Sequence, residues 1–290
     1  MSCRNFLESK KLVQLENPNN VGGSTNWTPP FYRNLQLTLP HMSGSDILVA
    51  KHLLVRCPIV DPNLVLSNVF DSSVSLAVRR FQISASLPIT GILDNICSSA
   101  LLELYSRDMY QDSGKMDLPG YLYKLVIPVY KDRDIETLAS LYDSKMNLLY
   151  TFLVRTRGAN DRKTGLALNQ FTRNGYTPTG LSLMDLNSPE PDPAAFGPYP
   201  INRFTQGVVG NASWLISNLR NGILVHTGKW SASRPSPMPN SLGCVHAYAQ
   251  DVEKVWQILV SIGVEVRQNT LGALPYPYTS QGLVSVYQID

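Results

Sequence analysis

Apolar residues recur at helical spacing in three segments between residues 44 and 105. The clearest segment carries Val74, Ala77, Val78 and Phe81 at positions i, i+3, i+4 and i+7. This spacing places the four side chains on one face of a helix, where they can pack together. Each segment begins near short polar residues that can cap a helix N-terminus. These are Ser45 or Asp46, Ser72 or Ser73, and Asp94. The stretch therefore predicts a module of three amphipathic helices.

After residue 120 the pattern changes to short runs rich in β-branched and aromatic residues, which is typical of β-strands. The runs are YLYKLVIPVY, ETLASLYD, NLLYTFLVRTRG and GILVHTG. DSKMN separates the second run from the third and predicts a hairpin turn. Late in the chain, AQDVEKVWQILVSIG predicts a helix with Val252, Val255, Trp256 and Leu259 on one face.

Together these patterns predict an α+β fold with two domains, a small three-helix module followed by a mostly β domain. A chain of 290 residues is long enough for two domains that each bury a core. PEPDPAAFGPYP is too rich in proline for regular structure and predicts a long loop, a candidate flap over a site. The predicted parts are an irregular leader at 1–43, the helical module at 44–105, a polar linker at 106–120, the mostly β domain at 121–268 and a Pro- and Tyr-rich tail at 269–290.

Composition narrows the classes of function. The net charge of +3 is small and comes without a long basic run, so nucleic-acid binding has no support. No stretch approaches the roughly 20 apolar residues of a transmembrane helix. The start of the chain, MSCRNFLESKKLVQLENPNN, lacks the apolar core of a secretory signal peptide. The four cysteines include no CxxC pair and do not make a disulfide framework, although Cys57 and Cys97 are a candidate pair.

Residues 222–251 concentrate candidate chemistry. His226 ends an apolar run, a Pro- and Ser-rich loop follows, and Cys244 comes directly after Gly243 with His246 two positions later. A thiol becomes a useful nucleophile when a base or a cation nearby holds it as thiolate. The alternatives are a buried structural thiol and a metal site. A metal site would lack an obvious fourth ligand and a Cys–Cys pair, so no metal is predicted.

The same stretch resembles the signature of the L,D-transpeptidase (YkuD-like) catalytic domain. In that family a His in an HG, HS or HT stretch precedes the motif [S/T]HGC[I/V][R/N] by a short, nearly fixed interval. Here His226 precedes SLGCVH, and Cys244 follows it by 18 positions (244 − 226 = 18). TPTG at 177–180 resembles the family's TPxG element, which precedes a strand. The resemblance covers about residues 121–268, and its elements occur in the family's order.

The helical module resembles the peptidoglycan-binding type 1 repeat. That repeat has the pattern AV-x-x-FQ, then a turn with Gly and a hydrophobic residue, then a helix that ends in AL. The matching residues are Ala77, Val78, Phe81, Gln82, Gly91 and Leu101, and Val74 stands where Thr is more usual. The resemblance implies a module that anchors the chain to a peptidoglycan wall.

The catalytic resemblance implies that Cys244 attacks a carbonyl of a peptidoglycan stem peptide, with His226 as general base and then general acid. The carbonyl or the side chain of Thr227 would orient the imidazole, and backbone N–H groups near Gly243 and Cys244 would meet the oxyanion. Residues implied to contact the substrate are Trp230, Ser241, His246, Thr177 and Gly180. No cofactor or metal is implied. The family acts in the cell envelope or outside the cell, although no signal peptide is visible in this chain.

Leu242 is the main departure from the family pattern. It stands where the family has His, and its side chain can neither donate nor accept a hydrogen bond. His246 stands where Arg or Asn is usual. Three functions therefore remain open from the sequence: a cross-linking transpeptidase that forms a thioester, a hydrolase of the same fold, and a catalytically weak peptidoglycan-binding protein.

Overall fold

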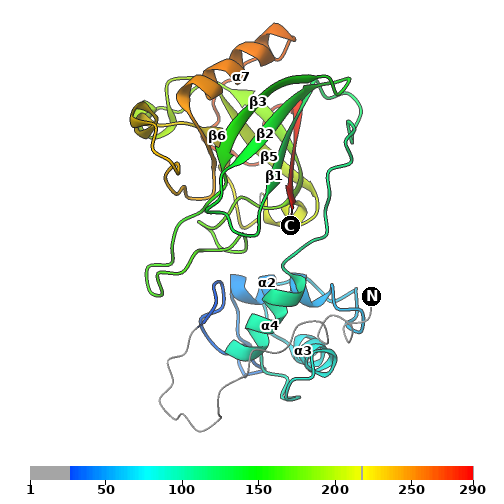
Figure 1. Ribbon diagram of the computed structural model, residues 1–290. Coiled ribbons are helices and arrows are strands. Elements are labelled where there is room, and N and C mark those ends of the chain that lie inside the picture. Colours follow the sequence, from blue (N-terminus) through cyan, green and yellow to red (C-terminus); the bar gives the residue numbers. More distant parts are fainter. Residues whose placement is uncertain (1–26, 217, 290) are drawn as a thin grey trace. The chain divides into compact units, whose positions relative to one another are not determined.

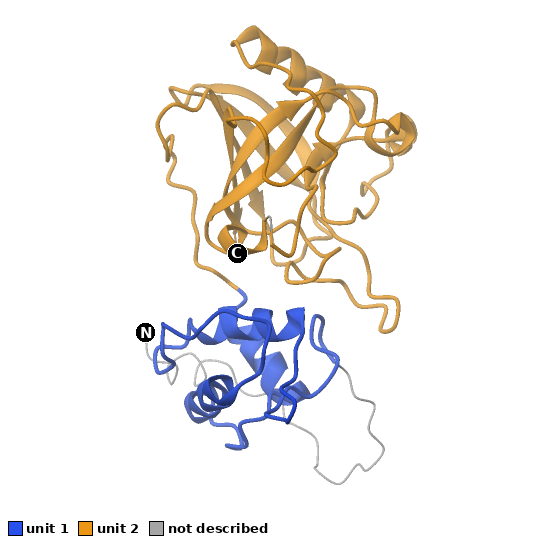
Figure 2. Ribbon diagram, turned by 180° about the vertical axis from the view of Figure 1, so that it is seen from behind, with its two compact units in different colours: residues 1–106 blue, residues 107–290 orange. Residues whose placement is uncertain are grey.

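The computed structural model describes residues 27–216 and 218–289. The chain divides into two compact units, residues 1–106 and residues 107–290 (Figure 2). The described part of the first unit is helical, and the second unit is built on a β-barrel. The fold class is therefore α+β, as the sequence predicts.

The first unit contains the three predicted helices. They are α2 (Ser45–Leu54), α3 (Ser72–Ser84) and α4 (Asn95–Tyr105). All four residues of the apolar face predicted for α3 are buried. Cys57 and Cys97 lie buried in the same unit as free thiols, so the candidate disulfide between them does not form.

The helix caps follow the sequence only in part. Asp94 caps α4 as predicted, by accepting a hydrogen bond from the Cys97 N–H at 2.8 Å. The caps predicted for the other two helices are wrong. Asp71 caps α3, because its carboxylate reaches the Val74 N–H at 3.1 Å from an extended backbone, and Gly44 precedes α2 without a side-chain cap.

The pattern residues Gln82 and Gly91 have structural contacts within this unit. The Gln82 amide accepts hydrogen bonds from the Gly91 and Thr90 N–H groups and donates to the Ile92 carbonyl at 2.9 Å. Gly91 has a φ of +74°, and a Cβ there would lie 2.7 Å from the Ser75 hydroxyl oxygen. These two residues therefore hold the turn between α3 and α4.

The predicted leader is partly integrated into the first unit. Residues 1–26 lie outside the described residues. Residues 27–43 are mostly irregular, as predicted, yet Phe31 and Leu35 are fully buried. The Leu35 backbone also pairs with Leu93 next to α4. This segment therefore belongs to the core of the unit, because two large apolar side chains gain burial there.

Eight strands close into a barrel in the second unit, in the order β1–β2–β3–β7–β6–β5–β4–β8 (Figure 1). They are β1 (Tyr123–Val129), β2 (Thr137–Asp143), β3 (Leu148–Arg155), β4 (Gly180–Asn187), β5 (Ile201–Val209), β6 (Leu224–His226), β7 (Val245–Ala247) and β8 (Gly282–Gln288). The four predicted runs contain β1, β2, β3 and β6, and the predicted hairpin turn joins β2 to β3. The strand expected after TPTG is β4. The sequence patterns did not predict β5, β7 or β8.

The predicted tail and linker both belong to the barrel unit. β8 pairs in parallel with β1 and antiparallel with β4, so the tail expected at 269–290 contains the strand that closes the barrel. Within the predicted linker, the Tyr110 hydroxyl lies 2.9 Å from the Ser285 hydroxyl. Asp112 and Asp117 form ion pairs at 2.7 Å with the buried Lys124. These contacts join residues that are far apart in the sequence. Local composition therefore could not show that the segments predicted as linker and tail are part of the barrel unit.

Helix α7 (Ala249–Ser261) completes the core of the barrel unit. It packs against β3 and β6 (Figure 1). Val252, Val255 and Leu259 of its predicted face are buried, and Trp256 is partly buried against the same core. The short helices are α5 (Pro193–Phe196), α6 (Ala212–Leu215) and the 3-10 turn η1 (Lys229–Ser233). Within 27–216 and 218–289, no helix combines the length and the apolar character needed to cross a bilayer.

Candidate active site

Strand pairing places the candidate base on β6, next to β7, the strand that begins directly after the candidate nucleophile. β6 and β7 run parallel, with His226 opposite His246 and Val225 opposite Val245. Side chains alternate between the two faces of a sheet, so the histidines share one face and the valines pack into the core on the other. Cys244 directly precedes β7, two residues before His246, and is partly buried against the hydrophobic core. The interval of 18 positions (244 − 226 = 18) thus spans one connection between adjacent parallel strands.

The His226 ring is held as a base. Its Nδ1 lies 2.6 Å from the Thr227 carbonyl oxygen, and a carbonyl can only accept, so Nδ1 carries the proton. The neutral ring therefore keeps its lone pair at Nε2. The Thr227 hydroxyl is buried without a hydrogen-bond partner among the described residues. Of the two orienting groups considered from the sequence, the carbonyl makes the contact.

Aromatic rings pack around this base. His226 meets the edge of His246 at 4.8 Å between ring centroids, and Phe196 of α5 packs against it at 5.0 Å. Phe196 belongs to the proline-rich loop, so that loop lies against the base. A Cβ at Gly197 would approach the Thr227 methyl group to 2.3 Å, which explains the small residue there. Burial lowers the pKa of His226, so the ring is neutral at neutral pH.

The Cys244 thiol rests in its protonated form. Its Sγ lies 3.7 Å from the Gly222 carbonyl oxygen, to which it donates. Burial raises the pKa of the thiol, and the positive charges of Arg220 and Arg203 oppose that rise only in part. Thiol and imidazole are therefore both neutral at rest. A pair in this state reacts when the base takes the proton as the sulfur attacks.

Buried hydroxyls hold the loop that carries the nucleophile. The Thr177 hydroxyl donates to the Gly243 carbonyl at 3.0 Å, and the Ser241 hydroxyl donates to the Cys244 carbonyl at 2.8 Å. The Gly243 N–H donates to the Ser241 hydroxyl oxygen at 2.9 Å. The Gly243 N–H, one of the groups near the oxyanion position implied by the sequence, therefore already has a partner. Thr177 and Ser241 lie behind the loop, against its backbone.

The remaining sequence-derived candidates lie in different places. Trp230 on η1 stacks at a tilt on His246 with 5.0 Å between ring centroids. Gly180 lies away from this group at the start of β4, where its φ is +125° and a Cβ would lie 2.1 Å from the Val209 carbonyl oxygen. Leu242 is 67% exposed and presents an apolar surface beside the nucleophile. Gly180 is thus a structural glycine, whereas Trp230 borders the site.

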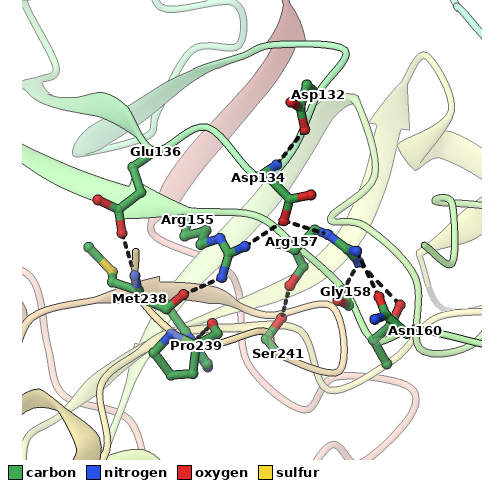
Figure 3. Close-up of polar contacts among 12 residues, drawn as sticks. Asp132, Asp134, Glu136, Arg155, Arg157, Gly158, Asn160, Met238, Pro239 and Ser241 are labelled. Carbon is green, nitrogen blue, oxygen red and sulfur yellow. Dashed lines mark hydrogen bonds and ion pairs between the residues drawn. The ribbon is translucent and has the colours of Figure 1, made fainter. Parts of the chain in front are cut away.

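A polar network at the end of β3 also holds the loop that carries Cys244. The sequence patterns did not predict this network. Figure 3 shows Asp134 between the guanidinium groups of Arg155 and Arg157, at 2.6 and 3.0 Å. Arg155 donates to the Met238 carbonyl, and the Ser241 N–H donates to the Arg157 carbonyl at 2.9 Å. Two features of the sequence could have indicated this network: the alternating arginines in VRTRG and the acidic residues in DRDIE.

Two cavities include residues that contact His226 or Cys244. One of about 490 Å³ has Thr227, Tyr199 and Lys229 in its wall and so adjoins the base. A small cavity of about 10 Å³ is lined in part by Gly222, whose carbonyl oxygen accepts a hydrogen bond from the Cys244 thiol. It shares Tyr276 with a further cavity of about 490 Å³. Among the described residues, no group of three or more His, Cys, Asp or Glu is arranged to hold a metal ion.

Because the histidines are buried, we expect acid to destabilise the barrel unit. Burial, with the adjacent His226, lowers the pKa of His246 to about 3. Below pH 6.5 the unfolded chain therefore binds protons that the folded chain does not, and stability falls with falling pH. We expect His246 alone to account for a loss of about 2 kcal/mol in the free energy of unfolding between pH 7 and pH 5. Urea unfolding followed by tryptophan fluorescence should show this loss reduced in His246→Asn. Equal pH dependence in both proteins would contradict the prediction.

This chain is similar to known proteins at low sequence identity and low structural similarity. Neither a protein-family model nor a curated protein matches the sequence. Among solved structures, an L,D-transpeptidase from Xylanimonas cellulosilytica is 15% identical with a TM-score of 0.30, covering 90% of this chain and 100% of the other. An L,D-transpeptidase from Stackebrandtia nassauensis is 11% identical with a TM-score of 0.31, covering 85% and 92%. A fused Zn-dependent amidase/peptidase/peptidoglycan-binding protein from Clostridium acetobutylicum is 14% identical with a TM-score of 0.25, covering 88% and 99%. Scores this low establish neither a family nor an activity for this chain.

Proposed function

We propose that the barrel unit is a cysteine-dependent acyl transferase that acts on peptidoglycan stem peptides. The observation that carries the proposal is the His226 ring, whose Nδ1 proton is held by the Thr227 carbonyl at 2.6 Å, so that Nε2 is left as a base. His226 lies on β6, which pairs with β7, and Cys244 directly precedes β7. The substrate class comes from the ordered TPTG, His226 and SLGCVH motifs, which resemble those of L,D-transpeptidases.

The proposed reaction has two halves. Nε2 of His226 takes the Cys244 proton while Sγ bonds to the peptide carbonyl carbon, and the Thr227 carbonyl stabilises the imidazolium. His226 then gives the proton to the departing amine, and a thioester remains on Cys244. In the second half, an acceptor amine attacks the thioester, His226 takes its proton, and the thiol is restored. Water in place of the amine gives hydrolysis.

One cavity and Leu242 bear on how this reaction runs. The cavity of about 490 Å³ that has Thr227 in its wall would receive a substrate next to the base. Leu242 brings no polar group, so proton transfer in the proposed reaction falls to His226. The first unit would bind peptidoglycan, as its sequence pattern implies. The proposed substrate would place the protein in the cell envelope or outside the cell.

Detection of the acyl-enzyme tests the proposal. The full chain is incubated with a synthetic stem tetrapeptide or with a carbapenem, and its intact mass is measured. A covalent adduct on the wild type and on Cys57→Ala, but not on Cys244→Ala, is the expected result, because Cys57 is a free thiol in the other unit. A wild-type chain without an adduct, or an adduct that survives in Cys244→Ala, would contradict it. Product masses with and without an amine acceptor then separate transfer from hydrolysis.

A further inference from the structure

Arg220 is a buried cation without a carboxylate partner in the described part of the chain. Its side chain is 2% exposed. One nitrogen, Nη1, donates to the Gln170 and Tyr176 carbonyls at 3.0 and 2.9 Å, and Nη2 donates to the Gly175 carbonyl at 3.0 Å. Carbonyl dipoles solvate a guanidinium but do not cancel its charge. Buried charges are normally paired, so this arrangement leaves a net positive charge inside the barrel unit.

This charge lies directly behind the peptide of the nucleophile. A Cβ on Gly243 would come within 1.8 Å of Nη2 of Arg220, so the guanidinium occupies the space that a side chain there would need. Gly222, two residues after Arg220, supplies the carbonyl oxygen that accepts a hydrogen bond from the Cys244 thiol. One short segment therefore provides both the resting partner of the thiol and a cation beside it.

Within residues 27–216 and 218–289, the other charged and titratable groups near the thiol are either paired or neutral, and Arg220 has no ion-pair partner. Arg203 on β5 forms an ion pair with Glu190, so their effects on the thiol oppose each other. The two histidines on β6 and β7 have pKa values lowered by burial and are neutral at pH 7. Burial lowers the pKa of Arg220 to about 10, so it is still protonated at pH 7.

We propose that Arg220 is a positioning residue that supplies the counter-charge for the negative charge formed at Cys244. The inference rests on Cys244 being the nucleophile of the proposed function. A cation that three backbone carbonyls already hold needs no reorganisation when the thiolate or the oxyanion appears. Arg220 thereby offsets the penalty that burial places on ionisation of the thiol.

The pH dependence of Cys244 alkylation by iodoacetamide tests this. An opposite charge near a thiol lowers its pKa by at least about one unit, so Arg220→Gln should slow alkylation at pH 8 about tenfold. Arg220→Lys, which keeps the charge, should stay close to wild type. Arg133→Gln is the matched control, since Arg133 is buried and also donates to carbonyl and hydroxyl oxygens, those of Thr177 and Thr156. A pH profile of Arg220→Gln identical to wild type would overturn the proposal.

A second pair of variants leaves Arg220 in place, in case its replacement prevents folding. Cys244→Asp and Cys244→Asn are close in shape and differ by one charge. Beside an unpaired cation, the Asp variant should be at least as stable as the Asn variant at pH 7.5 and lose that advantage in acid. An Asp variant that is less stable at pH 7.5 would overturn the proposal. Neither experiment uses an acyl donor, so a wild type that forms no acyl-enzyme rejects the proposed function without deciding the role of Arg220.

Discussion

Replacement of His226 by alanine is expected to slow acyl-enzyme formation by about 10²–10⁴-fold, the usual contribution of a general base. The thiol at rest is protonated because burial raises its pKa, so it depends on a base within reach to lose its proton. The Nδ1 proton of His226 is tied to the Thr227 carbonyl, which leaves the Nε2 lone pair as the base. The rate of adduct formation, followed by intact mass, measures the effect.

His246 provides the comparison for that experiment. Its ring touches the His226 ring, and its Nδ1 lies 2.9 Å from the Pro239 carbonyl oxygen within the anchored loop. We expect His246→Asn to slow adduct formation less than tenfold, since its amide can replace that contact. Equal losses in the two variants would mean that His226 acts through packing and not as the base.

Replacement of Gly243 by alanine is expected to lower the free energy of unfolding by about 4 kcal/mol. The φ of Gly243 is +108°, a conformation that costs other residues about 1–3 kcal/mol. The new methyl group would also meet Nη2 of Arg220 at 1.8 Å and the Gly175 carbonyl oxygen at 2.7 Å. Overpacking of this kind typically costs a further 1–3 kcal/mol or so. Urea unfolding of the barrel unit measures the sum.

Gly222→Ala is the matched control for strain without overpacking. Gly222 has a φ of +67°, and a Cβ there would meet nothing within 4 Å. We therefore expect a loss of only about 1–2 kcal/mol from the left-handed backbone. A similar loss in both variants would show that the approach of Arg220 to Gly243 adds nothing to stability.

Local patterns determined those parts of the fold whose stabilising contacts are close in sequence. The apolar face of α3 was predictable because residues three and four apart share a face of any helix. The Asp94 cap and the turn between β2 and β3 are equally local. The proposal that His226 and Cys244 act together comes from another kind of signal: a family-like interval between two chemical residue types is itself a sequence feature. That feature indicates chemistry but no geometry.

Tertiary structure alone decided how the barrel closes and what surrounds the thiol. β7 contains three residues, too few to show a period, and is a strand because β3 and β6 supply its partners. β8 lies in a segment whose prolines and tyrosines resemble a tail, yet it pairs with β1 from the far end of the unit. The place of Arg220 behind Gly243 depends on a loop 44–50 positions upstream that offers three carbonyls. Strand partners and the surroundings of a buried charge are contacts between distant residues, so they exist only once the chain has folded.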